Sequence, residues 1–71
     1  MPHIVVYSPR LTREKKVALV AGLTDAFHDA TGIDSAHLVI HIEEHSYDNV
    51  GVAGKLLTDA FPALAERERD G

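Results

Sequence analysis

The stretch that decides the fold is HLVIHIEEH, residues 37–45 of the 71-residue chain. Apolar and polar residues alternate along it with a period of two, which is the pattern of a β-strand with one face toward a core. One face carries Leu38, Ile40 and Ile42, and the other carries His37, Val39, His41, Glu43 and His45. The pattern predicts a strand that places its apolar face on a helix and turns a more polar face away.

A long helix is predicted just before this strand, over residues 13–31. Apolar residues recur there at three- and four-residue spacing. They form two adjoining rows, which are Val17, Val20, Thr24, Phe27 and Thr31, and Leu19, Leu23, Ala26 and Ala30. Thr12 suits the N-cap and Gly32 suits a left-handed C-cap. The two rows together make an apolar face wider than a two-stranded sheet can cover.

The chain begins MPHIVVY, residues 1–7, and its β-branched and aromatic residues predict a first strand that Pro9 ends. Strand, helix and strand at this spacing predict a βαβ unit with two parallel strands and a right-handed crossover. The fold class is therefore α/β (α+β). Residues 50–54 predict a tight hairpin or an extended arm, and Pro62 can open a short terminal helix over residues 63–69.

The chain is long enough for one domain, residues 1–71, but too short for a large core. A domain of this size buries only ~60% of its unfolded surface, and no cysteine is present to reinforce it. Two parallel strands with one helix leave a sheet face open to water. We therefore expect a homo-oligomer in which strands of a second copy extend the sheet.

The net charge of −4 argues against a general binder of nucleic acid or of an anionic membrane. No apolar run reaches the length of a membrane span, and no signal region opens the chain. A cytoplasmic protein is the expectation.

Pro2 is a candidate catalytic residue because removal of Met1 would expose its secondary amine. An α-amino group has a pKa near ~8, and surroundings that lower this pKa toward 7 would make it a general base. The structural alternative is that Pro2 simply begins an edge strand.

For Arg10, for His41 and for the polar strand face, the sequence allows both a functional and a structural role. Arg10 is either an anion-binding residue or a loop cation that pairs with an acid, and His41 is either a hydrogen-bond donor to a substrate or an interface residue. A zinc site is the rival hypothesis for the polar strand face. Its four candidate ligands are His37, His41, Glu43 and His45. They would span ~20 Å or more, so at most three could converge.

Several of these features together resemble the 4-oxalocrotonate tautomerase family, the branch of the tautomerase superfamily with a short βαβ subunit. The features are Met1-Pro2 leading directly into a strand, Arg10-Leu11-Thr12 before the helix, the turn at Gly32, and Val50-Gly51-Val52-Ala53-Gly54 after the second strand. The resemblance covers roughly residues 2–57, so residues from about 58 to 71 are a C-terminal extension.

The resemblance implies a keto–enol tautomerase that uses no metal or organic cofactor. It implies that Pro2, after loss of Met1, takes a proton from one carbon and returns it to another. It also implies that Arg10 binds the carboxylate of a small anionic substrate. Members of the family assemble as dimers or hexamers, with the glycine-containing hairpin at a subunit interface.

Two departures from the family pattern bear on the substrate. A second arginine of the parent enzymes is replaced by Val39, with His41 next on the same strand face, and a phenylalanine is replaced by Val50. These changes favour a 2-hydroxy-dienoate or 2-keto acid with one carboxylate on Arg10 and its enolate oxygen on His41. The alternatives are a hydratase or dehalogenase of the superfamily, with protonated Pro2 as the acid, or a non-catalytic oligomeric binding module.

Overall fold

The computed structural model describes residues 1–70, without the side chains of residues 68–70, so the last residue of the expected extension lies outside the described part. The elements are, in order, β1 (His3–Ser8), α1 (Arg13–Thr31), the 3-10 helix η1 (Ser35–His37), β2 (Val39–Glu44), the 3-10 helix η2 (Tyr47–Asn49), β3 (Gly51–Val52), β4 (Lys55–Leu56), α2 (Leu57–Ala60) and α3 (Pro62–Asp70). Two compact units are formed, one by residues 1–6 and 12–42 and the other by residues 7–11 and 43 onward.

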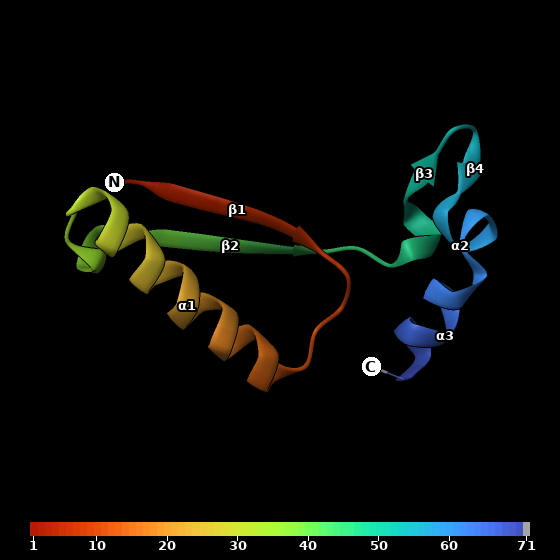
Figure 1. Ribbon diagram of the computed structural model, residues 1–71, viewed down its shortest axis with the longest axis horizontal. Helices are drawn as coiled ribbons and strands as arrows, with labels where there is room; N and C mark the ends of the chain where they lie inside the picture. The colour runs from red at the N-terminus through yellow and green to blue at the C-terminus, as the bar shows by residue number, and fades with distance from the viewer. Residues whose placement is uncertain (71) are drawn as a thin grey trace. The chain divides into compact units, whose positions relative to one another are not determined.

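The strands β1 and β2 form a two-stranded parallel sheet, which confirms the predicted βαβ unit (Figure 1). At the start of the sheet the Val39 N–H donates to the Pro2 carbonyl at 3.0 Å. The second strand is shorter than predicted. The Asp34 carboxylate accepts from the Ala36 N–H at 3.0 Å, and this turn keeps His37 in η1, outside the strand.

Helix α1 has the predicted bounds and the predicted caps. The Thr12 hydroxyl accepts from the Lys15 N–H, and Gly32 takes a left-handed conformation at φ 72° while its N–H donates to the His28 carbonyl. The side of α1 that is half-buried carries Lys16, Leu19, Leu23, Thr24 and Phe27. Part of the predicted apolar face is therefore left uncovered, with Val17 57% exposed and Val20 38% exposed.

The second unit contains the predicted hairpin. Strands β3 and β4 are antiparallel, with Gly51 opposite Leu56 and Val52 opposite Lys55. The two residues between them, Ala53-Gly54, both have positive φ angles, 52° and 84°, as a two-residue type I′ loop requires.

The short helix α2 was not predicted, because non-local contacts hold it. The Leu57 N–H donates to the Val50 carbonyl at 2.7 Å, and the Thr58 hydroxyl donates to the Asp48 carboxylate at 2.6 Å. These bonds join α2 to the base of the hairpin and to η2. Helix α3 begins at Pro62, as predicted.

No residue among those whose burial the structure describes is buried, so the single chain has no closed hydrophobic core. Along β1, half-buried residues alternate with exposed ones, and the exposed side includes Val5 and the 76% exposed Tyr7. Val52 and Leu56 of the hairpin are also exposed. Burial of apolar surface is the dominant favourable term in folding, so these faces still need to be covered.

Candidate active site

Pro2 lies immediately before β1 and is held there by its backbone. Its carbonyl accepts the hydrogen bond from Val39, and Pro2 is half-buried while Met1 is 82% exposed. Met1 therefore contributes little packing, and its loss would leave the proline nitrogen at the end of an anchored strand. The geometry gives that nitrogen a fixed position at the start of the sheet.

His41 lies on the exposed side of β2 and contacts His3 of β1. The His3 Nδ1 and His41 Nε2 atoms are 3.1 Å apart and form a hydrogen bond whose direction depends on the tautomers. The two rings are stacked, with centroids 5.3 Å apart and planes inclined by 14°. The sequence placed His41 on this face, but nothing in it showed that His3 would be its partner.

Arg10 belongs to the second unit and lies in the loop after β1. The Leu11 N–H donates to a carboxylate oxygen of Glu44 at 3.0 Å, and the Ser8 carbonyl accepts from the His45 N–H at 2.8 Å. The backbone on both sides of Arg10 is therefore anchored to the end of β2. Arg10 itself is exposed, and no hydrogen bond or ion pair joins its guanidinium to another residue in the described part of the chain.

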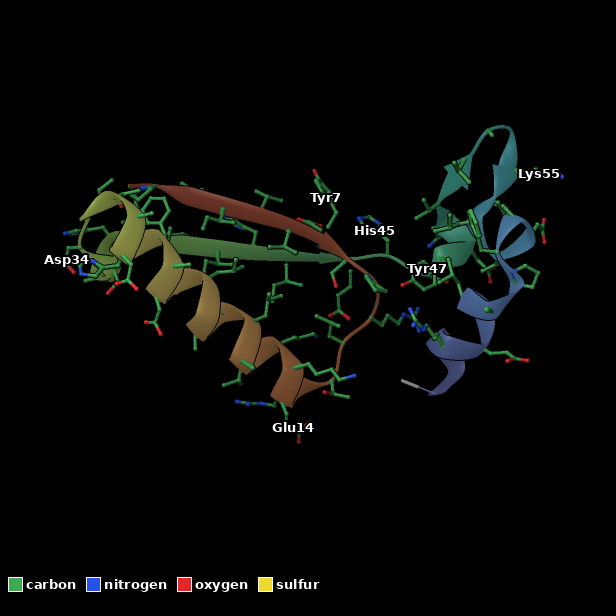
Figure 2. The ribbon with its side chains drawn as sticks, viewed as in Figure 1. Tyr7, Glu14, Asp34, His45, Tyr47 and Lys55 are labelled. Carbon is green, nitrogen blue, oxygen red and sulfur yellow. The ribbon has the colours of Figure 1, made fainter. Side chains whose placement is uncertain are left out.

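The second unit also contains a cavity of about 250 Å³, next to the loop that carries Arg10. Figure 2 shows Tyr7 and His45 close together, and their ring centroids are 5.8 Å apart. The cavity is lined by Tyr7, Ser8, Pro9, His45, Tyr47, Val50 and Leu57. These walls combine apolar surface with hydroxyl and imidazole groups, which suits a small molecule with an apolar part.

Val50 was noted from the sequence only as the residue in place of a family phenylalanine, and the structure places it in the wall of this cavity. Leu57 belongs to α2, which was not predicted. Tyr7 lies on the exposed side of β1, and this position in the strand pattern could have indicated that its ring lines a surface cavity.

The structure distributes the three predicted site residues between the two units. Pro2 and His41 belong to the first, and Arg10 belongs to the second. The rival zinc site is not formed: within residues 1–67, no three metal-ligating side chains lie close enough together to hold an ion. His41 is instead hydrogen-bonded to His3, and His45 lies beside Tyr7. In the described part of the chain no helix is both long and apolar enough to cross a membrane.

Comparisons with known proteins agree with the fold. A family model described as tautomerase enzyme matches residues 2–60. The 2-hydroxymuconate tautomerase of Bacillus subtilis strain 168 is 38% identical over 60 residues, which cover 83% of this chain and 97% of that protein. A probable tautomerase of Bacillus cereus is 37% identical over 60 residues, with coverage of 83% and 98%.

Solved structures give the same result. The crystal structure of YwhB, a homologue of 4-oxalocrotonate tautomerase, matches with a TM-score of 0.76 and 37% identity, covering 82% of this chain and 97% of that one. DmpI from Archaeoglobus fulgidus matches with a TM-score of 0.74 and 40% identity, covering 82% and 100%. The family resemblance expected from the sequence is confirmed.

The anchoring of the Arg10 loop by Glu44 gives a direct prediction. We expect Glu44→Ala to speed hydrogen exchange of the Leu11 amide roughly tenfold, because a bond to a charged acceptor is lost. Glu44→Gln keeps an oxygen acceptor and should retain most of the protection. Exchange measured by NMR, with the Leu23 amide of α1 as an internal control, tests this; unchanged exchange at Leu11 in Glu44→Ala would contradict it.

Proposed function

This chain belongs to the tautomerase enzyme family, as an isomerase of the 4-oxalocrotonate tautomerase type, and we propose that it interconverts the keto and enol forms of a small 2-hydroxy-dienoate or 2-keto acid. The observation that carries the proposal is the position of Pro2. Its carbonyl is anchored to Val39 at the start of the sheet, and the adjacent Met1 is exposed.

The proposed chemistry uses the Pro2 amine after removal of Met1. In its neutral form the nitrogen has a lone pair that can take a proton from the carbon beside a carbonyl or enol group. The resulting secondary ammonium then returns that proton to another carbon of the same molecule. The backbone bond to Val39 supports this role, because it holds Pro2 in place at the start of the sheet.

Arg10 is proposed to bind the substrate carboxylate. A guanidinium matches a carboxylate with two parallel hydrogen bonds, and Arg10 is exposed on a loop that Glu44 anchors through Leu11. His41 is proposed to donate to the oxygen that becomes negative in the enolate. Because Val39 occupies the position of the second family arginine, we propose a substrate with one carboxylate.

The cavity beside the Arg10 loop supports a substrate with an apolar part. Its volume of about 250 Å³ and its aromatic walls suit a phenylpyruvate-like compound as well as an extended dienoate. The B. subtilis relative is, by its name, a tautomerase of 2-hydroxymuconate.

Association of copies is part of the proposal. The exposed apolar side chains of β1, α1 and the hairpin would be covered by other copies, in a dimer or a hexamer. The same proposal includes a single domain over residues 1–71 and the cytoplasmic location expected from the sequence.

We expect Pro2→Ala to lower kcat/KM roughly 100-fold in ketonisation of 2-hydroxymuconate or enol-phenylpyruvate, because a positioned general base is replaced by a different amine. Intact mass must first show that Met1 is absent from both proteins. For a base, kcat/KM should rise with pH through the titration of the amine; in the hydratase or dehalogenase alternative, which needs the protonated amine, activity should fall. Equal rates for the two proteins would rule the role out.

We expect Arg10→Ala to raise KM for the monocarboxylate enol-phenylpyruvate by roughly 10- to 100-fold, because charged hydrogen bonds to the carboxylate are lost. Arg10→Lys should recover part of the loss, since it keeps the charge without the bidentate geometry. Arg13→Ala, at the start of α1, removes the same charge three residues away and is the matched control. A similar change in KM for Arg13→Ala and Arg10→Ala would contradict a specific role for Arg10.

A further inference from the structure

His3 directly follows Pro2, and its ring is hydrogen-bonded to the ring of His41. Only one hydrogen can lie between the His3 Nδ1 and His41 Nε2 atoms at 3.1 Å, so one ring donates and the other accepts. Both residues are exposed on the sheet face that α1 does not cover. The contact occupies Nδ1 of His3 and Nε2 of His41, so the second nitrogen of each ring is not engaged by the other ring.

The direction of this bond decides what His41 can do. When His3 Nδ1–H donates, His41 Nε2 is the acceptor, and the hydrogen of a neutral His41 must sit on Nδ1, where it faces away from His3. When His41 Nε2–H donates instead, the outward Nδ1 of a neutral His41 is an acceptor. An acceptor repels an enolate oxygen, so only the first arrangement gives a neutral His41 that can stabilise one.

The histidine pair lies next to Pro2 along the sheet, since His3 follows Pro2 in the chain and His41 is bonded to His3. The bond between the Val39 N–H and the Pro2 carbonyl aligns Pro2 with Val39, and His41 is two residues further along the same strand. Two strand residues span ~6.6 Å. A small 2-keto acid can therefore place a carbon at Pro2 and an oxygen near His41 at the same time.

We propose that His3 is a positioning residue for the reaction at Pro2, holding His41 in the tautomer that carries its hydrogen on Nδ1. The proposal rests on the proposed function, because it assigns the outward Nδ1–H of His41 to a substrate oxygen. It deepens that function, because the oxygen that gains charge is recognised by a histidine pair and not by a second arginine. The pair suits a keto or enol oxygen better than a second carboxylate, since it offers one outward donor when neutral.

The first test is spectroscopic and needs no substrate. Two-bond nitrogen–proton NMR correlations on the full-length protein at pH 8 should show His41 with its hydrogen on Nδ1. In His3→Phe, which keeps a flat ring but has no donor, His41 should become a mixture of tautomers. In His3→Asn, whose amide N–H can replace the Nδ1–H of His3, the Nδ1–H form of His41 should be retained. His37→Phe, in η1 and outside the pair, should leave the His41 signals unchanged.

The second test is kinetic. His3→Phe should lower kcat/KM about three- to tenfold, mainly through kcat, because the lost contact acts on the developing enolate. His3→Asn should stay within about twofold of the native protein, and circular dichroism checks that both variants are folded. His41 found with its hydrogen on Nε2, or identical His41 tautomers in the native protein and His3→Phe, would overturn the proposal. An active Pro2→Ala protein with the expected His41 tautomer would instead refute the proposed function while the pairing stands.

Discussion

A βαβ unit with two strands and one helix has too few faces to bury its own apolar side chains, and the rest of this structure depends on that constraint. No residue whose burial is described is buried, although the local structure is well specified by caps, turns and backbone pairing. Local hydrogen bonds contribute only ~1 kcal/mol each, so they cannot replace a hydrophobic core. We therefore propose that copies of the chain complete the core by covering the exposed side of β1, Val17 and Val20 of α1, and the hairpin.

The same constraint explains why the proposed site is built from strand ends. Pro2 is anchored where β1 begins, and Arg10 follows where β1 ends, on a loop that Glu44 holds through the Leu11 amide. The bond from Val39 to Pro2 and the bond from Leu11 to Glu44 both start or end on β2. Neither involves a buried side chain, so both bonds are kept only while the strand is formed. Arg10 and Pro2 stand at opposite ends of one short strand in the sequence. In the proposed assembly, different copies can supply the two groups to one site.

Much of the fold could be predicted from periodicity and capping alone. Thr12 and Gly32 mark the ends of α1, and the period-two pattern marks β2, because these signals act through neighbouring residues. Three features could not be read in this way. They are the 3-10 turn that removes His37 from the strand, the helix α2 held by Val50 and Asp48, and the bond between His3 and His41. The helix and the histidine bond depend on contacts that are set by three-dimensional proximity and not by local propensity. The turn depends on the local bond from the Ala36 N–H to the Asp34 carboxylate, which competes with extension of the strand to His37.

We propose that association of copies supplies the hydrophobic core that the single chain lacks. Sedimentation velocity and circular dichroism on one dilution series, from about 100 μM to the nanomolar range, test this most directly. We expect a single oligomeric species at high concentration, and loss of secondary structure that coincides with dissociation on dilution. A thermal midpoint that rises with protein concentration would agree with it. A folded monomer that keeps its helix and sheet at micromolar concentration would contradict the account.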